Sequence, residues 1–435
     1  MAAGLPVHPP VTRAGRSSLC VLSLAEAAAA IREGRSTSSE LVGDCLERIE
    51  EVDPKVQAWA FLDRDHALRQ AEAADLQHKH GTAPGPLHGV PVGVKDIFDT
   101  FDMPTEHGSP IYAGHRPRAD AAPVALTRKA GGVILGKTVT AEFATFVPRE
   151  TRNPRDLSRT PGGSSSGSAA AVADCMVPLA FGTQTAGSVI RPGSYCGVVA
   201  YKPTYNTLPR AGVKPNADSL DTVGLYARSV EDAAFFTQAL IGLPPATLDR
   251  PRIGMCRTWE WDQVRPEMAA AFENAARRLE AKEARLPESF KGLRKAHTSV
   301  IWFEGARSLA DEFRRFPEKI DPALRKRCEN GYAIPWPEYA AALQAGRSAR
   351  ARLEEAFAGC DVLIAPAATG EAPPGLGSTG DTAMNVVWTL LHVPCVSLPV
   401  MKSPAGLPLG LQVIGRLGDD ARTLACAKWI EGALA

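Results

Sequence analysis

The stretch from residue 161 to 196 constrains this chain most, because glycine, serine and alanine alternate there with short apolar runs. It holds two glycine-flanked serine clusters, GGSSSGS and TAGSVIRP. Ser164 opens the first cluster, and Ser188 is the single serine of the second. Lys95 lies upstream in GVKDIFDT. Serine needs an adjacent base to act as a nucleophile, and glycine turns let backbone N–H groups face an oxyanion. The sequence therefore offers a nucleophile, a base and an oxyanion hole.

Strands and helices alternate around these residues. Residues 89–97 form an apolar run typical of a buried strand, and Lys95 lies inside it. A predicted helix (121–130) is followed by a strand (132–138), and a second helix (168–174) is followed by another strand (177–183). This alternation predicts an α/β sandwich whose mixed, largely parallel sheet is covered by helices.

Local signals predict several further helices. Ser23 is expected to cap a helix that stops at Gly34, and Ser38 or Ser39 a second one that continues through Glu51. The remaining expected helices cover 65–78, the segment that starts at Ser229, and part of the charged, aromatic region 286–338. We expect that charged region to cover the core and to shape the substrate mouth. The loop 103–112 and the region 290–390 are expected to set the shape of the substrate.

Length alone suggests two or three domains for 435 residues, but large α/β chains often form one. No fixed-period repeat occurs, and no proline linker isolates 286–338. We therefore expect a loose N-terminal tail (1–20) and one domain (21–435). The tail lacks the continuous apolar segment of a signal peptide. The longest apolar run, 169–181, contains Asp174 and is too short to span a membrane.

Charge and cysteine content exclude several functions. The net charge of +1 gives no electrostatic case for binding nucleic acid or an anionic membrane. Nine cysteines, an odd number without a CxxC pair, argue against a disulfide framework and against a zinc site. The scattered histidines have no partners at metal-ligand spacing, so no metal site is expected. A reducing, cytoplasmic location is the natural one for such a chain.

Lys95 is the most telling single residue of the sequence. A surface lysine at a strand end is the ordinary interpretation, but Val92, Val94 and Ile97 favour burial. Burial lowers the pKa of a lysine and makes the neutral, basic form available. Asp96 does not contradict this, since adjacent strand residues point to opposite faces.

Several motifs together resemble the amidase signature family of serine hydrolases, and within it the malonamidase-like hydrolases of small amides. Their order and spacing make the match far more specific than a single motif. The matching segments are GPLHGVPVGVKDIFDT, AGGVILGKTVTAEFA, both serine clusters, GVVAYKPTYNTLPRAGV, DTVGLYARSVEDAA, DVLIAPA, WTLLHVPCVSLPV and GLPLGLQVIGR.

The resemblance implies the amidase signature fold and a Ser–cis-Ser–Lys triad. Ser188 would be the acylated nucleophile, Ser164 the bridging serine in a cis peptide, and Lys95 the base. The N–H groups of the turn that ends at Ser188 would hold the oxyanion, and one supporting serine would stabilise the network. These additional residues are Thr185, Ala186, Gly187 and, as support, Ser165.

Three residues near the nucleophile leave questions open. Many family members have an acidic residue at the place of Gln184 and a glycine at the place of Ala186, which bears on substrate preference. Arg191 follows the nucleophile by three positions. It either bonds backbone carbonyls near the turn or binds a substrate carboxylate through its guanidinium fork.

The expected activity is hydrolysis of a small amide by a cofactor-independent cytoplasmic enzyme, and an ester or a carbamate could be cleaved by the same attack. We expect no nucleic-acid or membrane partner, and a homodimer stays open. One alternative is a glutaminase subunit of a tRNA-dependent amidotransferase, which would need partner subunits. Another is an α/β-hydrolase esterase, because GSSSG fits G-x-S-x-G with Ser165 as nucleophile and His297 or His392 downstream.

Overall fold

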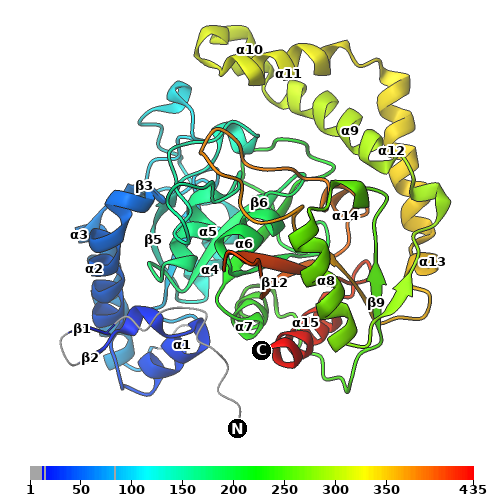
Figure 1. Ribbon diagram of the computed structural model, residues 1–435. Helices are drawn as coiled ribbons and strands as arrows, with labels where there is room; N and C mark the ends of the chain where they lie inside the picture. Colours follow the sequence, from blue (N-terminus) through cyan, green and yellow to red (C-terminus); the bar gives the residue numbers. More distant parts are fainter. Residues whose placement is uncertain (1–11, 14–15, 83–84) are drawn as a thin grey trace.

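A mixed sheet of 11 strands runs through the centre of the computed structural model, which describes residues 12–13, 16–82 and 85–435 (Figure 1). The strand order is β10-β9-β11-β13-β12-β7-β8-β6-β4-β5-β3. The strands are β3 (Trp59–Leu62), β4 (Pro91–Lys95), β5 (Val133–Thr138), β6 (Leu179–Gln184), β7 (Val199–Lys202), β8 (Thr222–Ala227), β9 (Ile253–Cys256), β10 (Lys282–Ala284), β11 (Val362–Pro366), β12 (Cys395–Lys402) and β13 (Pro408–Ile414).

The sheet is mixed, as expected, but the expectation that it is largely parallel is wrong. The pairs β4/β5, β4/β6, β9/β10 and β9/β11 are parallel. The pairs β3/β5, β6/β8, β7/β8, β7/β12, β12/β13 and β11/β13 are antiparallel. Strand direction depends on how connections cross the sheet, and the local strand–helix alternation does not determine it.

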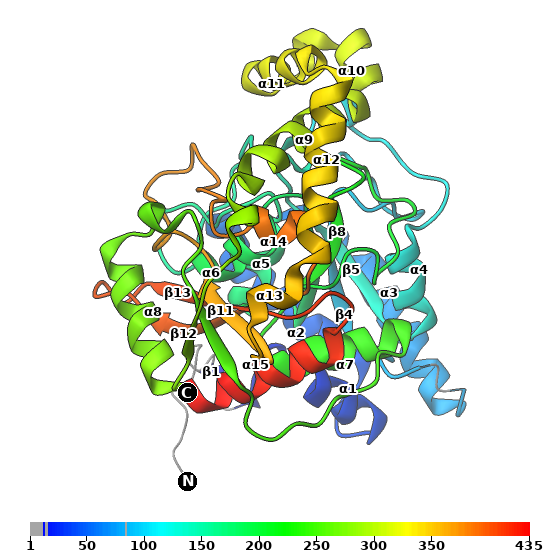
Figure 2. The same cartoon turned by 90° about the vertical axis from the view of Figure 1, so that its right-hand side faces the viewer.

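Helices cover the sheet in two layers (Figure 2). One layer contains α5 (Ser166–Ala173) against β4, β6 and β8, and α6 (Ile190–Cys196) against β7, β12 and β13. The other contains α4 (Ala122–Lys129), α7 (Val230–Ile241), α8 (Pro266–Arg278) and α15 (Asp420–Leu434). Every residue of β4, β5, β6 and β8 is buried, which explains their near-continuous apolar sequence.

The helix starts follow the capping signals, with one exception. Ser23 caps α1 (Leu24–Arg32) in a capping box with Glu26, and Ser229 accepts the N–H of Asp232 at the start of α7. The prediction that Ser38 or Ser39 caps the second helix is wrong. Thr37 is the cap of α2 (Ser38–Val56), because Glu40 completes the capping box at the third helical position.

A group of helices from the charged region rises above the sheet (Figures 1 and 2). It consists of α9 (Leu293–Ser308), α10 (Ala310–Arg315), α11 (Pro322–Ala333) and α12 (Trp336–Ala351). Glu312 on α10 ties the group to the core, since it accepts hydrogen bonds from Tyr112 (2.6 Å) and Lys214 (2.5 Å). The helical cover expected over the core is therefore present.

The start of the chain is only partly described. Two short strands, β1 (Thr12–Arg13) and β2 (Arg16–Ser17), pair with each other, and the rest of the expected loose tail before residue 18 lies outside the described residues. The tail boundary at residue 20 is too late. Ser18 and Cys20 are buried, and both donate hydrogen bonds to Asp44 on α2, at 2.6 and 2.7 Å. The single domain over 21–435 stays a prediction.

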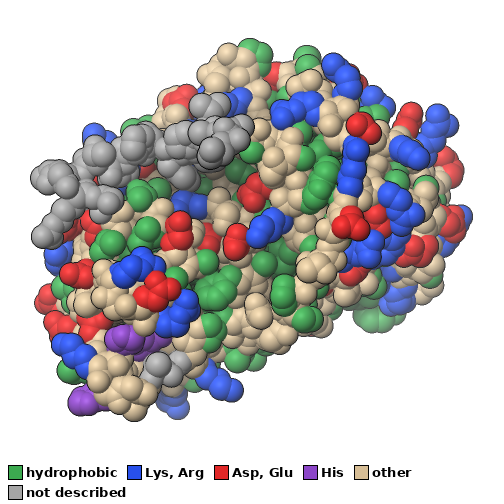
Figure 3. Space-filling view, turned by 90° about the horizontal axis from the view of Figure 1, so that it is seen from below, with side chains coloured by type: hydrophobic (Ala, Val, Ile, Leu, Met, Phe, Trp, Pro, Cys, Tyr) green, Lys and Arg blue, Asp and Glu red, His purple; other side chains and the backbone are tan. Residues whose placement is uncertain are grey.

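Two features of the surface and core agree with the composition. All nine cysteines are buried, as expected of small apolar side chains. Basic and acidic side chains intermingle on the face of the molecule seen in Figure 3. Among the described helices, none combines the length and the apolar character that crossing a membrane requires.

Candidate active site

Lys95, the last residue of β4, is fully buried and faces two hydroxyl groups. Its Nζ lies 2.8 Å from Ser164 Oγ and 2.8 Å from Thr183 Oγ1. Burial lowers the pKa of Lys95 well below its usual value, while the negative charge of Asp221 acts in the opposite direction. Within the described residues no carboxylate forms an ion pair with Lys95. The neutral amine is therefore the favoured form at this position.

Ser164 lies in a loop that is fixed on both sides. The Gly163–Ser164 peptide bond is cis, as the family resemblance implies. Arg191 donates a hydrogen bond of 2.6 Å to the carbonyl of Gly163, and the N–H of Ala141 donates one of 3.0 Å to the carbonyl of Ser164. These contacts hold the Ser164 hydroxyl next to Lys95.

Ser165 supports β6, the strand that carries Thr183, and does not face the cavity described below. Its Oγ accepts the N–H of Thr183 (3.2 Å) and lies 3.3 Å from the carbonyl of that residue. It therefore fixes the strand that carries the second hydroxyl partner of Lys95. The segment before Ser165 is a loop with isolated β-bridges and contains no strand. Ser165 itself is fully buried. This arrangement does not match the strand-to-helix elbow of an α/β-hydrolase.

Ser188 ends a turn in which each of the four carbonyl groups has a hydrogen-bond partner. His297 Nε2 lies 2.8 Å from the carbonyl of Thr185, and Thr389 Oγ1 lies 2.8 Å from that of Ala186. The other two carbonyls, of Gly187 and Ser188, accept from the N–H of Arg191 (3.0 Å) and from the hydroxyl of Tyr226 (3.0 Å). In a planar trans peptide the N–H points opposite to the carbonyl, so these contacts also fix the N–H groups.

The N–H groups of the turn are candidates for an oxyanion hole. None of the hydrogen bonds found in the described part of the chain uses the N–H of Ala186, Gly187 or Ser188 as a donor. Gly187 is required here, because a Cβ at this position would lie 2.5 Å from Oδ1 of Asn385. The backbone of the turn is thus in close contact with the start of α14 (Val386–Leu390).

Gln184 stabilises the turn and does not line the cavity around Ser188. Its Oε1 accepts the N–H groups of Val189 (2.9 Å) and Ile190 (3.0 Å), and its Nε2 donates to Thr389 (2.9 Å). A carboxylate could accept the same two N–H groups but could not donate to Thr389. The amide at the place of the acidic residue therefore serves the backbone of the turn.

Ser188 opens onto a cavity of about 560 Å³ between the sheet layer and the helices α9 and α11. Ser188 itself is 7% exposed. The charged side chains of the wall are mostly basic and comprise Arg191, Arg294, Lys326, Arg327 and one acid, Asp381. The region 286–338 therefore shapes the mouth, as expected, whereas the loop 103–112 does not line this cavity.

Two arginines in the wall are nearly fully buried. Arg191 donates to the carbonyls of Gly163 and Gly380 and to Thr379, which is the structural role considered for it. Arg327 donates to Oδ1 of Asn216 (3.1 Å), and its Nε has no partner among the described residues. Burial lowers the pKa of Arg327 to about 10, so its guanidinium stays charged at neutral pH.

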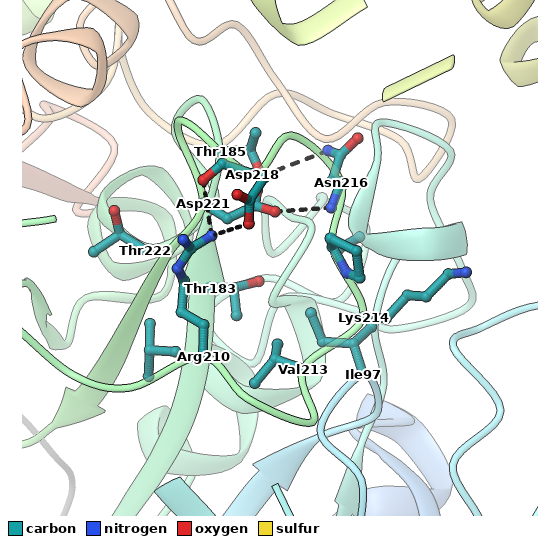
Figure 4. Close-up of a pocket in the computed structure, with 13 residues that line it drawn as sticks. Ile97, Thr183, Thr185, Arg210, Val213, Lys214, Asn216, Asp218, Asp221 and Thr222 are labelled. Carbon is teal, nitrogen blue, oxygen red and sulfur yellow. Dashed lines mark hydrogen bonds and ion pairs between the residues drawn. The ribbon is translucent and has the colours of Figure 1, made fainter. Parts of the chain in front are cut away.

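A second, smaller cavity of about 130 Å³ lies behind the turn (Figure 4). Asp221, at the cavity wall, accepts hydrogen bonds from Thr185 Oγ1 (2.5 Å) and from the N–H groups of Asn216 (2.8 Å) and Ala217 (3.1 Å). Burial raises the pKa of Asp221 to about 6. Thr183, the hydroxyl partner of Lys95, lines the same cavity, so Asp221 and Lys95 are close enough for their charges to interact.

The structure brings the predicted Lys95 and Ser164 into hydrogen-bond contact and places Ser188 at the larger cavity, but no hydrogen bond joins Ser164 and Ser188 within the described residues. The sequence reasoning missed Thr183, Asp221, Asn216 and Arg327, and it considered His297 only as part of the elbow alternative. Thr183 could have been identified from the sequence, since it lies at the end of a predicted strand beside the one with Lys95. The other four belong to segments distant from the serine clusters, and no local pattern marks them.

Comparison with known proteins agrees with this site. A family model described as amidase matches residues 40–424. The A subunit of the glutamyl-tRNA(Gln) amidotransferase of Anaeromyxobacter sp. (strain K) is 34% identical and aligns over 95% of this chain and 96% of its own. The corresponding protein of Thermobifida fusca (strain YX) is 33% identical over 96% of this chain and 97% of its own.

Solved structures give the same result. A crystal structure of an amidase has a TM-score of 0.89 and 31% identity, and the match covers 95% of this chain and 100% of that one. The structure of 6-aminohexanoate cyclic dimer hydrolase complexed with substrate has a TM-score of 0.84 and 27% identity, with coverage of 96% and 97%. The relatives named above with more than 30% identity are amidotransferase subunits and an amidase, and they support the family without the narrower likeness to malonamidase-like hydrolases. Because the family model spans most of the chain and these relatives cover nearly all of it, the protein belongs to the amidase family of hydrolases, which act on carbon–nitrogen bonds.

Proposed function

We propose that the protein hydrolyses a small amide that carries a carboxylate group, with Ser188 as nucleophile, Ser164 as proton relay and Lys95 as neutral base. The observation that carries the chemistry is the buried Lys95 amine, bound to Ser164 without a carboxylate partner among the described residues. A neutral amine can donate to Thr183 through one N–H while its lone pair accepts the proton of Ser164.

The Lys95–Ser164 contact supports the second half of the proton relay, and the proposal requires in addition that Ser188 reach Ser164, a hydrogen bond that the described residues do not form. The Ser188 proton moves to Ser164 Oγ as the Ser164 proton moves to Lys95 Nζ, and Ser188 Oγ bonds to the amide carbon. The turn N–H groups bind the oxyanion, and removal of one such donor typically costs ~3–4 kcal/mol. When the C–N bond breaks, Ser164 protonates the leaving nitrogen and Lys95 returns a proton to Ser164. Water then hydrolyses the acyl-enzyme by the reverse route.

The substrate class is inferred from the cavity wall. Arg327 keeps a buried positive charge without an ion-pair partner among the described residues, and it makes one hydrogen bond there, whereas Arg191 makes three. A substrate carboxylate would supply that partner, because a guanidinium binds carboxylates through paired N–H donors. Lys326 and Arg294 add positive charge to the same cavity.

A second candidate is the glutaminase reaction of an amidotransferase. The similarity to glutamyl-tRNA(Gln) amidotransferase subunits over nearly the whole chain favours it, and glutamine is itself an amide with a carboxylate. That candidate predicts low activity of the isolated chain and stimulation by partner subunits. Turnover of simple amides by the purified chain alone would favour the independent hydrolase.

The test combines a substrate panel with covalent labelling. The wild type is assayed on glutamine, a malonamate-like amide, matched neutral amides, an anilide and a carbamate. We expect Ser188→Ala to abolish turnover with the fold intact, and a fluorophosphonate to label Ser188. Ser165→Ala is the matched control and should still be labelled at Ser188. A label on Ser165, or none on Ser188, would contradict the proposed nucleophile.

A further inference from the structure

His297 lies at the junction of the substrate cavity and the nucleophile turn. It belongs to α9, lines the cavity beside Ser188 and is 3% exposed. Its Nε2 lies 2.8 Å from the carbonyl of Thr185. A carbonyl oxygen only accepts hydrogen bonds, so Nε2 carries the proton and donates it. The ring is therefore the neutral tautomer with hydrogen on Nε2, and burial lowers the pKa of His297 to about 4, which agrees with that form.

The carbonyl that His297 holds belongs to the peptide group whose N–H is that of Ala186. In a planar trans peptide the two groups point in opposite directions, so fixing one fixes the other. Thr185 is also held through its side chain, because Oγ1 donates to Asp221. The N–H of Ala186 is left without a partner among the described residues, as expected of a donor reserved for substrate.

We propose that His297 is a positioning residue that orients the Thr185–Ala186 peptide as a donor to the oxyanion. The inference rests on the proposed function, since it takes Ser188 as the nucleophile. His297 acts through the backbone and does not exchange protons with the triad. In the described structure it makes no hydrogen bond to Ser188 or Ser164, so it is not placed to act as their base.

The role couples the cavity wall to the reaction centre. α9 carries His297 together with Arg294, Thr298 and Ile301, which also line the cavity. A substrate that packs against this helix therefore contacts the same element that holds the oxyanion peptide. Substitution of His297 should therefore destabilise the transition state, in which the carbonyl oxygen of the substrate becomes charged, and should have little effect on ground-state binding.

Three substitutions separate the positioning role from others. His297→Gln keeps an N–H donor near the place of Nε2, His297→Asn moves the donor toward the place of Nδ1, and His297→Leu removes it. We expect kcat of the Asn and Leu variants to fall about 10- to 100-fold with KM changed less than about threefold. The Gln variant should keep kcat within about threefold of the wild type. Binding of a trifluoromethyl ketone analogue of the best substrate should weaken in parallel with kcat.

Other outcomes would overturn the inference. Equal losses in all three variants would show that the ring is needed for something other than its Nε2 donor. Unchanged kcat in the Leu variant, or a loss confined to KM, would exclude a role at the oxyanion. Fluorophosphonate labelling of Ser188 in the wild type distinguishes failure of the His297 inference from failure of the proposed function. Absence of that label rejects the proposed nucleophile itself. Thermal melting of each variant verifies that it is folded.

Discussion

Three lysines in the described part of the chain are fully buried, and their surroundings differ. Lys137 forms an ion pair with Asp96 at 3.0 Å, and Lys202 donates to the carbonyls of Val393 and Pro203. Lys95 meets two hydroxyl groups. Asp96 follows Lys95 directly in sequence but pairs with Lys137, as the alternation of side chains along a strand predicts. Burial lowers the pKa of all three lysines, and Lys95 alone among them contacts a serine hydroxyl in the described structure.

The charge of Asp221 acts on the pKa of Lys95, which gives a prediction for the pH profile. Asp221 favours the protonated form of Lys95, so Asp221→Asn should lower the pKa of Lys95. Activity that requires neutral Lys95 rises with pH, and in the variant this rise should shift to lower pH. The comparison is made above pH 6, where Asp221 of the wild type is charged.

The measurement is the midpoint of the rising limb of kcat/KM, because the plateau also depends on the bond between Asp221 and Thr185. Asp218→Asn is the matched control. That carboxylate pairs with Arg210, its side chain is 83% exposed, and it lies at the same small cavity (Figure 4). Its removal should leave the midpoint in place. A shift of the Asp221→Asn midpoint to higher pH would contradict the assignment of Lys95 as the base.

At the scale of elements, α11 and α6 offer arginines with different roles. Arg327 on α11 packs so closely on α9 that a Cβ at Gly305 would lie 2.9 Å from its Nη2. Arg191 on α6 binds the Gly163 carbonyl beside Ser164. The Nε of each arginine has no partner among the described residues, but Arg191 makes three hydrogen bonds through its other nitrogens and Arg327 makes one.

We therefore expect Arg327→Met to lower kcat/KM for carboxylate-bearing amides about 10- to 100-fold, with neutral amides within about threefold. Arg191→Lys should lower the rates for both substrate types together and reduce thermal stability, because a lysine cannot bond Gly163, Gly380 and Thr379 in the same fork. The measurement is kcat/KM for matched pairs of acidic and neutral amides, which shows which of the two arginines binds the substrate carboxylate. A selective loss in Arg191→Lys would instead assign the carboxylate to Arg191.

The sequence predicted elements with local signals well, both near the serine clusters and far from them, as α3 (Arg64–Lys79) and the expected helix 65–78 illustrate. The strands that carry Lys95 and Thr183, and the helix after Ser164, were expected within a few residues of their observed bounds. Apolar runs and capping residues are local signals, so they define such elements. Thr37 was missed as a cap because four adjacent hydroxyl residues, from Ser36 to Ser39, compete for that position, and Glu40 decides among them.

For the whole molecule, the family and the reaction class follow from ordered motifs, whereas the complete site does not. His297, Asn216 and Asp221 contact Thr185 of the turn from loops and helices far along the chain, and Arg327 contacts Asn216. Their contacts depend on how the helices above the sheet pack, and packing is a tertiary property without a local signature. The direction of the strands at the C-terminal half was unpredictable for the same reason.

Burying a neutral lysine has a consequence for the stability of the whole protein. The unfolded chain keeps Lys95 charged up to its usual pKa of about 10.5, whereas the folded chain holds it neutral at much lower pH. Between the two pKa values the unfolded state binds one more proton, so the free energy of unfolding rises with pH by ~1.4 kcal/mol per unit. The free-energy penalty for burying the neutral amine therefore grows as pH falls from about 10.5, and at neutral pH this penalty opposes folding.

Lys95→Met removes that penalty, and we expect it to abolish turnover while it raises stability at pH 7. The difference in the free energy of unfolding between Lys95→Met and the wild type should narrow by ~1.4 kcal/mol per pH unit between pH 8 and 10. The reason is that only the wild type then gains stability from deprotonation of the unfolded lysine. Urea unfolding of both proteins across this range measures the difference. Lys137→Met is the control and should be less stable than the wild type, since it leaves Asp96 buried without its cation. A constant difference between Lys95→Met and the wild type from pH 8 to 10 would show that Lys95 is charged in the folded protein and would remove it as the neutral base.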